Sequence, residues 1–211
     1  DMTTPAAKAE LERTKGLAST RQLVEAKAHD PLCFEPGTDF LYSLSHDVLA
    51  AVIEAASGMR FSEYLRANIF GPLGLKNTGF FPSAAQVARI CAQYEYDDAR
   101  GVPLLCPTEA NSYRYSPNYE SGGAGLIIRA ADYGELLSRL SQGKLIKKET
   151  LDLMRTNQLD ETRLADLHKT EWLPPYGYGL GVRTLLYPEK IGHTAPKGEF
   201  GWDGAAGSYA M

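Results

Sequence analysis

The chain has 211 residues, 44% of them hydrophobic and 23% charged, and its formal net charge is -4. This composition is typical of an ordinary globular protein. Its 22 basic and 26 acidic residues leave no net positive field for phosphates, so no nucleic-acid partner is expected. The longest apolar runs are far shorter than the ~20 residues that a membrane-spanning helix requires, so no transmembrane segment is expected either.

Cysteine and histidine usage argues against a metal or a disulfide framework. The three cysteines, Cys33, Cys91 and Cys106, lack C-x-x-C spacing, and the four histidines lack the spacing of metal ligands. We expect buried or free thiols, although Cys91 and Cys106 could pair across a loop in an oxidising compartment. No cofactor is expected. The residues leave the compartment, cytoplasmic or periplasmic, and the oligomeric state open.

Both ends of the sequence indicate a piece of a longer protein. Asp1 is not a translation start, and no signal peptide follows it. Residues 201–211 alternate small and aromatic side chains and stop without a turn or a polar tail, as a strand does when it is cut inside its sheet. We expect this piece to form a single compact unit.

Helical signals dominate the first part of the chain. The strongest covers residues 45–57, where Ser45 is the expected cap, apolar residues recur at helical spacing, and Gly58 ends the helix. A threonine before Pro5 and a capping box that begins at Ser19 start two earlier helices. The full set of expected helices covers residues 5–15, a segment after Ser19, and residues 45–57, 61–70, 130–140 and 148–155.

The spacing changes from helical to alternating near the C-terminus. Residues 176–184 carry bulky side chains on one face and glycines on the other. This pattern predicts a strand whose bare face is closely approached by another backbone or element. A second strand is expected over residues 199–210, and a short one around residues 90–96 within an irregular stretch at 79–119.

The order of these elements predicts the fold class. Helices come first and strands last, which is typical of an α+β fold. We expect a mostly helical region with irregular excursions over residues 1–170, and a partial antiparallel sheet over residues 171–211.

Two short motifs are set aside. Residues 122–125 (GGAG) are expected to form a tight turn rather than a phosphate loop, because no strand precedes them and no Lys-Ser/Thr follows. Ser141 and Lys144 match S-x-x-K, in which a lysine amine takes the proton of a serine hydroxyl one helical turn away. Because Gly143 between them is typical of a helix end, we interpret this match as accidental.

Five blocks in a fixed order determine the interpretation of the sequence. They are FEPGTDFLYS at 34–43, DVL with VIE and SG at 47–58, IFGPLGL with TGF at 69–80, GGAGL with ADY at 122–133, and YGLGV at 178–182. Together they resemble the serine β-lactamase-related hydrolases, which include class C β-lactamases, low-molecular-weight penicillin-binding peptidases and family VIII esterases. The likeness extends from about Leu23 over nearly the whole chain. It implies a β-lactamase/transpeptidase-like fold and an acyl-enzyme reaction on ester or amide bonds.

The resemblance also implies a set of site residues. In that family a serine and lysine in S-x-x-K, a tyrosine in the tyrosine motif Y-x-N or Y-S-x, and a strand motif such as K-T-G, H-x-G or W-x-G meet in one cleft. Tyr42 matches the tyrosine, whose implied role is to share protons with the lysine, activate the serine and protonate the leaving group. In isolation, Tyr42 would be interpreted as a core tyrosine instead. The serine and lysine would lie upstream of Asp1.

The strand motif has its match close to the C-terminus. Trp202, Asp203 and Gly204 match W-x-G, and the backbone N–H of Ala205 is then implied as an oxyanion-hole donor beside that of the missing serine. The alternative interpretation is an aromatic core strand. His193 is a competing H-x-G-like match, but it lacks the final glycine, so Trp202 is preferred.

Two departures from the family pattern point to neutral esters. The tyrosine motif has Leu44 where lactamases and peptidases carry an asparagine, so a substrate-binding amide is missing. Trp202 and Asp203 stand where a lysine would hold a substrate carboxylate. We expect a small-molecule ester or amide substrate for the whole serine hydrolase, and no activity from this piece alone. The alternative is a non-catalytic binding or interaction domain of the same fold.

Overall fold

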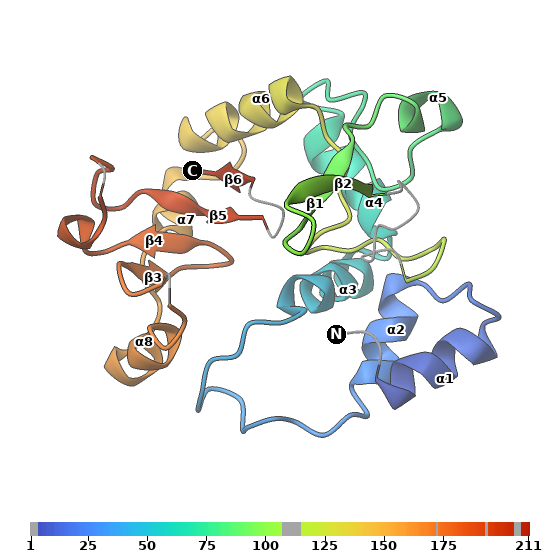
Figure 1. Cartoon of the computed structure of the whole chain (residues 1–211), viewed down its shortest axis with the longest axis horizontal. Helices are drawn as coiled ribbons and strands as arrows, with labels where there is room; N and C mark the ends of the chain where they lie inside the picture. The colour runs from blue at the N-terminus through green and yellow to red at the C-terminus, as the bar shows by residue number, and fades with distance from the viewer. Residues whose placement is uncertain (1–3, 107–114, 172, 193, 205–207) are drawn as a thin grey trace. The chain divides into compact units, whose positions relative to one another are not determined.

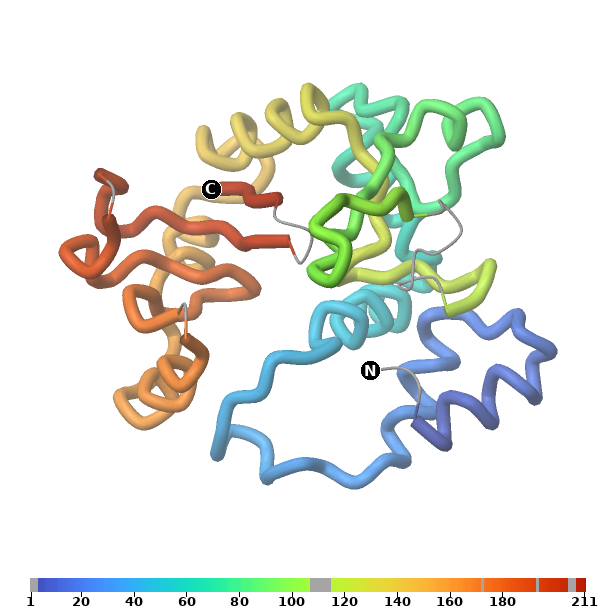
Figure 2. Tube along the Cα trace, viewed as in Figure 1, coloured from blue at the N-terminus to red at the C-terminus, as the bar shows by residue number. Residues whose placement is uncertain are grey.

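The chain divides into two compact units. The computed structural model describes residues 4–106, 115–171, 173–192, 194–204 and 208–211. Unit 1 consists of Asp1–Pro31 and Leu44–Tyr133, and unit 2 of Leu32–Ser43 and Gly134–Met211. The backbone therefore leaves unit 1 after residue 31, contributes residues 32–43 to unit 2, and returns, a path that can be followed in Figure 2.

Unit 1 is mainly helical (Figure 1). Its elements are α1 (Pro5–Arg13), α2 (Thr20–Lys27), α3 (Ser45–Ser57), α4 (Phe61–Leu65), a π-helix (Arg66–Phe70), α5 (Ala84–Val87), β1 (Gln93–Asp97), β2 (Val102–Cys106) and the first turn of α6 (Ala130–Ser141). Strands β1 and β2 pair antiparallel as a hairpin. One apolar cluster joins α1 and α2 to Tyr119, and a second joins α3 and α4 to Phe80.

The helices of unit 1 begin and end close to where the sequence predicts. The Thr4 side chain caps α1, and Ser19 forms the predicted capping box of α2. Helix α3 covers the predicted range and ends at Gly58, whose φ of 68° is left-handed. The prediction that Ser45 caps α3 is wrong. Leu44 occupies the cap, and no side chain provides the capping hydrogen bond.

Two stretches of unit 1 differ from the prediction. The expected helix at 61–70 is α-helical only through α4, and its second half is a π-helix. The stretch at 79–119, expected to be irregular with one short strand, contains α5 and both strands of the β1–β2 hairpin. Residues 122–124 form the expected turn. A Cβ on Gly122 would overlap the backbone carbonyl of His46, so glycine there lets the turn approach α3.

A buried carboxylate fixes the segment that precedes this turn. Glu120 is 1% exposed and accepts hydrogen bonds from the backbone and hydroxyl of Ser62, at 2.7 and 2.8 Å, and from the guanidinium of Arg60 at 2.6 Å. Its own backbone exchanges two hydrogen bonds with the Thr20 hydroxyl. The segment is thereby linked to both α2 and α4, and the polar groups of the buried side chain are satisfied.

Unit 2 combines an antiparallel sheet with short helices. It holds the rest of α6, α7 (Lys148–Met154), α8 (Glu161–Leu167), β3 (Tyr176–Tyr178), β4 (Arg183–Leu185), a 3-10 helix (Pro188–Lys190), β5 (Phe200–Asp203) and β6 (Tyr209–Ala210). The strand order is β3-β4-β5-β6, and every neighbouring pair is antiparallel. The core of unit 2 contains Leu167 of α8, Leu173, and strand residues Tyr176 and Leu185.

Each strand predicted near the C-terminus is two strands. The expected strand at 176–184 is the β3–β4 hairpin, because the chain turns at residues 179–182, where Gly181 has a φ of 80°. The expected strand at 199–210 contains two strands, β5 and β6, which pair antiparallel. Helix α8 was not predicted. These helices and strands give the α+β fold class that the sequence predicts.

The bare face of the β3–β4 hairpin is closely approached, as the sequence predicts. A Cβ built on Gly177 would lie 2.5 Å from the side-chain oxygen of Asn157, and one on Gly179 would overlap the carbonyl oxygen of Met154. The same carbonyl accepts a hydrogen bond of 2.8 Å from the backbone of Leu180. Glycine is therefore required where the end of α7 packs on this hairpin.

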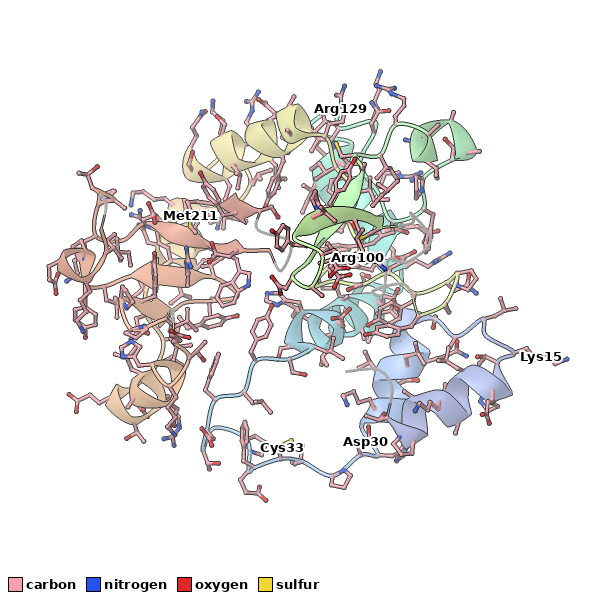
Figure 3. The ribbon with its side chains drawn as sticks, viewed as in Figure 1. Lys15, Asp30, Cys33, Arg100, Arg129 and Met211 are labelled. Carbon is pink, nitrogen blue, oxygen red and sulfur yellow. The ribbon has the colours of Figure 1, made fainter. Side chains whose placement is uncertain are left out.

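The contacts group most of α6, together with α7 and α8, with the sheet, although the sequence places these helices in the expected helical region 1–170. The expected boundary at residue 170, and the expectation that the whole chain forms a single compact unit, remain predictions. Across the described ranges, no helix combines the length and hydropathy needed to cross a membrane. The thiols of Cys33, Cys91 and Cys106 are free, so the pair that the sequence left open does not form. Figure 3 shows Cys33 on the connector between α2 and α3, and its side chain is exposed.

Candidate active site

Tyr42 lies on the segment 32–43, whose shape is set by a turn and two anchors. The turn contains Pro36 and Gly37, and the Gly37 φ of 81° is one that glycine adopts without strain. The Gly37 carbonyl accepts a hydrogen bond of 2.7 Å from the Arg163 guanidinium of α8. Phe40 packs against the unit 2 core and meets the ring of Tyr178 edge-on, with centroids 6.0 Å apart. These contacts fix the backbone immediately before Tyr42.

The ring of Tyr42 stacks on the ring of Trp202 in β5. Their centroids are 5.6 Å apart and their planes differ by 13°. Tyr178 of β3 meets the same indole edge-on, with centroids 5.7 Å apart. Because Tyr42 and Trp202 both belong to unit 2, the geometry within that unit joins the predicted tyrosine to the predicted strand motif.

The phenol of Tyr42 is open to solvent. Its side chain is 65% exposed, and no described residue hydrogen-bonds its hydroxyl. Tyr178 is less accessible. Burial raises the pKa of Tyr178, and the nearby Tyr42 phenol adds to this rise. The core-tyrosine interpretation therefore fits Tyr178 better than Tyr42, whose ring is fixed and whose hydroxyl bonds to no described residue.

Asp203, the second residue of the strand motif, is paired with an arginine. Its carboxylate accepts hydrogen bonds from both terminal nitrogens of Arg183 in β4, and one of them spans 3.3 Å. The Arg183 guanidinium also lies 4.1 Å from the centroid of the Tyr176 ring. This pair joins neighbouring strands and neutralises Asp203, so the negative charge that the sequence assigned to the strand motif is compensated.

The remaining motif residues are only partly described. Gly204 is exposed, and its backbone N–H donates to the carbonyl of Ser208, which precedes β6. Ala205, whose N–H is the expected oxyanion-hole donor, and His193, the competing match, lie outside the described residues. Their roles remain predictions.

Leu44, the third residue of the tyrosine motif, packs in unit 1. Its side chain contacts the cluster of Ala7, Leu23 and Tyr119. The position that an asparagine would occupy is thus used for packing.

The structure agrees with an accidental S-x-x-K match, because α6 ends at Ser141 and Gly143 has a φ of 67°, so Ser141 and Lys144 do not share a helix. Ser141 and Lys144 are exposed and do not form a buried nucleophile pair.

The sequence did not single out Tyr178, Phe40 and Arg183 as neighbours of the site. One signal could have identified Arg183, since it is the large side chain among the glycines on one face of the stretch 176–184. Within the part of the chain that is described, no group of three or more histidine, cysteine or acidic residues could hold a metal ion.

A profile of the Beta-lactamase family matches residues 2–211, and the chain belongs to this family. Esterase EstB of Burkholderia gladioli is 29% identical over 198 residues, which cover 85% of this chain and 48% of EstB. The chain spans about half the length of the curated relatives it matches.

Solved structures show the same fold. One of them is EstCE1, described as a hydrolase with promiscuous acyltransferase activity. It superposes with a TM-score of 0.72 at 26% identity, and the superposition covers 95% of this chain and 56% of EstCE1. The penicillin binding protein from Bacillus halodurans has a TM-score of 0.59 at 22% identity, with 79% of this chain and 46% of that protein covered. The chain has the β-lactamase/transpeptidase-like fold, and its relatives include esterases and acyltransferases.

Proposed function

We propose that residues 32–43 and β5 form part of the acyl-enzyme site of a serine hydrolase that acts on neutral esters. The observation that carries the proposal is the stacking of Tyr42 on Trp202, because it fixes the ring and leaves the hydroxyl accessible. A positioned phenol of this kind can exchange protons with a substrate that approaches from solvent. The nucleophilic serine and its lysine would be supplied by the longer protein.

Tyr42 would act in both halves of the reaction. In the first half, the serine oxygen attacks the ester carbonyl carbon and its proton passes to the Tyr42–lysine pair. The carbon–oxygen bond to the alcohol then breaks, and Tyr42 protonates the departing alkoxide. In the second half, Tyr42 accepts a proton from water as the water attacks the acyl-enzyme. As the bond between the acyl carbon and the serine oxygen breaks, Tyr42 returns this proton to the serine oxygen, which regenerates the serine and releases the carboxylic acid. The N–H of Ala205 is the proposed oxyanion donor.

Three features support an ester rather than a β-lactam or peptide. Leu44 offers no amide to a substrate amide. Trp202 places an aromatic ring where a lysine would attract a substrate carboxylate, and Arg183 already satisfies the carboxylate of Asp203. The name of the relative EstB points in the same direction. An uncharged ester requires neither of the two missing groups.

A non-catalytic binding domain is the second candidate. It is favoured by one observation, which is that the only S-x-x-K match in the sequence, at Ser141, ends a helix and is exposed. A protein that kept the fold but lost the serine and lysine would still present the aromatic groups beside β5.

The experiment compares the product of the complete reading frame with the 211-residue chain. Both are offered p-nitrophenyl butyrate and a chromogenic cephalosporin, and both are treated with a fluorophosphonate that labels activated serines. We expect ester turnover and one labelled serine in the longer protein, and neither in the 211-residue chain.

The outcomes separate the two candidates. Absence of turnover and of labelling in the longer protein would leave the binding domain as the function. A kcat/KM for the cephalosporin above that for the ester would overturn the preference for neutral esters and keep the acyl-enzyme chemistry. Ester turnover by the 211-residue chain itself would show that the nucleophile lies within it.

A further inference from the structure

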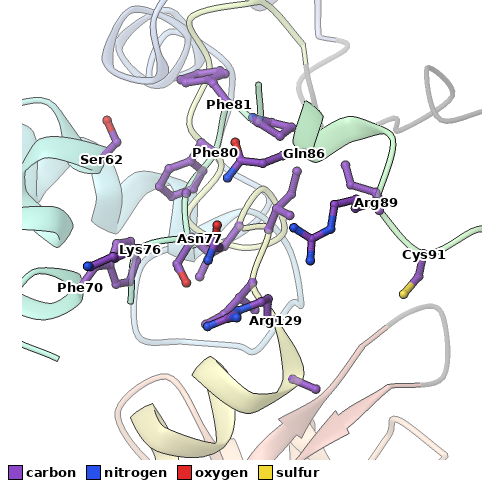
Figure 4. Close-up of a pocket in the computed structure, with 18 of the residues that line it drawn as sticks. Ser62, Phe70, Lys76, Asn77, Phe80, Phe81, Gln86, Arg89, Cys91 and Arg129 are labelled. Carbon is purple, nitrogen blue, oxygen red and sulfur yellow. The ribbon is translucent and has the colours of Figure 1, made fainter. Parts of the chain in front are cut away.

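Unit 1 contains a cavity of about 700 Å³ that does not include any of the candidate active-site residues. We call it the cationic cavity. It is lined by residues 76–82, by parts of 86–93, by residues 126–130, and by Ser62, Arg66 and Phe70 (Figure 4). Its volume is within the range of sites that hold small organic ligands.

The charged groups of this lining all carry the same sign. Four basic residues, Arg66, Lys76, Arg89 and Arg129, line the cavity, and no aspartate or glutamate is among the described residues that line it. Arg129 pairs with Asp132, a residue outside the lining, and this pairing lowers the pKa of Asp132. The other three cations form no ion pair with any described residue.

This imbalance is local, because the chain as a whole carries a net charge of -4. Like charges around one space repel each other, and an anion placed between them would remove this repulsion. Figure 4 shows that Lys76, Arg89 and Arg129 come from three different segments around the cavity, so the positive charge does not belong to a single stretch of chain.

Another part of the lining is aromatic and aliphatic. Phe70 and Phe80 are buried, and Phe80 belongs to the core cluster of Ala50 and Phe61, so this wall is held by the core of unit 1. Phe81 is 38% exposed at the rim. Asn77 and Gln86 add neutral hydrogen-bonding groups. A rigid apolar wall beside unpaired cations suits a ligand that has both an apolar body and an acidic group.

We propose that the cationic cavity binds a small amphipathic carboxylate. Its apolar body would lie against Phe80 and Phe81, and its carboxylate between Lys76 and Arg89. This site goes beyond the proposed function, because it shares no residue with Tyr42 and the strand motif and requires no nucleophile. Binding can therefore be measured on the 211-residue chain whether or not the longer protein hydrolyses esters.

The test is a calorimetric titration of the 211-residue chain with 2-naphthoate. The neutral isostere 2-naphthamide and inorganic phosphate are titrated in parallel. We expect saturable binding of 2-naphthoate, at least tenfold weaker binding of the amide, and no measurable binding of phosphate, which lacks an apolar body. Binding of 2-naphthoate should weaken as salt rises, because the four cations are exposed.

Two matched double variants locate the site. Lys76→Gln with Arg89→Gln should weaken 2-naphthoate binding by about five- to twentyfold, since each exposed pair contributes a few-fold in affinity. Lys8→Gln with Arg100→Gln removes the same charge from exposed positions outside the cavity, and should leave affinity within about twofold. Phe81→Ala should weaken the amide and the carboxylate alike.

Each result supports or overturns the site. If 2-naphthoate does not bind, if the amide binds equally well, or if both double variants weaken binding to the same degree, the cationic cavity is not a carboxylate site. If phosphate binds more tightly than 2-naphthoate, the cavity is a site for simple anions and the proposal of an amphipathic ligand is wrong. Unchanged melting temperatures of both double variants establish that any loss of binding is not a loss of folding.

Discussion

The hydroxyl of Tyr119 donates a hydrogen bond of 2.8 Å to the carboxylate of Asp47. Both side chains are buried, with exposed fractions of 3% and 1%. Asp47 lies in the first turn of α3, whereas Tyr119 directly precedes Glu120, the carboxylate bound by Arg60 and Ser62. The bond therefore ties the turn at residues 122–124 to the start of the helix that follows the tyrosine motif.

Tyr119→Phe should lower the free energy of unfolding by about 1.5–3 kcal/mol, because the buried carboxylate of Asp47 loses its donor. Urea denaturation of the two proteins measures this difference. Tyr94→Phe, at a position that is 63% exposed, is the control and should change the stability by less than about 0.5 kcal/mol. Equal effects of the two substitutions would show that the bond contributes nothing to stability.

Alkaline pH should reduce the difference in unfolding free energy between the wild-type chain and Tyr119→Phe. Burial, reinforced by the hydrogen bond to Asp47, raises the pKa of Tyr119 above the ordinary value of 10.0. Above pH 10, the unfolded chain loses a proton that the folded chain keeps, so stability falls as the pH rises.

Between pH 9 and pH 11, we expect the wild-type chain to lose about 1 kcal/mol more stability than Tyr119→Phe. The measurement is urea denaturation of both proteins at each pH, in which the titration of all other groups cancels in the difference. A difference that stays constant, or that widens with pH, would contradict the raised pKa.

Gly179→Ala should destabilise the chain by about 1–3 kcal/mol, because the added methyl group overlaps the carbonyl of Met154 and forces the end of α7 from the hairpin. Thermal unfolding gives the measurement. Gly192→Ala is a matched control, since a Cβ at that position meets no atom within 4 Å, and its effect should be below about 0.5 kcal/mol. Comparable stability of the two variants would refute the close approach.

Tyr42→Phe in the product of the complete reading frame should lower kcat for an ester by about 10²- to 10⁴-fold, the size expected for a positioned acid or base. Stability should change little, because the ring still stacks on Trp202. Steady-state kinetics and a melting curve give the two readouts. Tyr94→Phe again serves as the control, with unchanged kcat. An unaltered rate in Tyr42→Phe would remove this residue from the mechanism.

The sequence predicts what is local. The spacing of apolar residues and the position of Gly58 give both ends of α3, because the helix period and a left-handed terminal glycine are properties of neighbouring residues. The cap is an exception. Ser45 suits a cap, but it is the first residue of the helix, and Leu44 occupies the cap with its side chain packed against the core.

A glycine accounts for the incorrect prediction of one strand over residues 176–184. Alternation over residues 176–184 fits one strand, but glycine allows a turn as readily as it allows a close approach, and the positive φ of Gly181 makes the segment a hairpin. The close approach itself was predicted, since it follows from the absence of side chains on one face.

The candidate site was only partly predictable. Family resemblance predicted Tyr42 and Trp202, and the structure adds that their rings stack. The pairing of Arg183 with Asp203 depends on the register of β4 and β5, in which Arg183 lies opposite Gly201. Strand register is a tertiary property, so spacing along the chain does not give it.

Unit 2 is assembled from two separate lengths of chain, since Leu32–Ser43 contacts Gly134–Met211. Before these contacts form, the intervening residues 44–133 are a long loop whose closure costs conformational entropy. If those residues fold first, the ends of the loop are already held, and the cost of bringing Tyr42 to β5 falls. The order of folding events, rather than any local preference, then sets how quickly the tyrosine reaches its place.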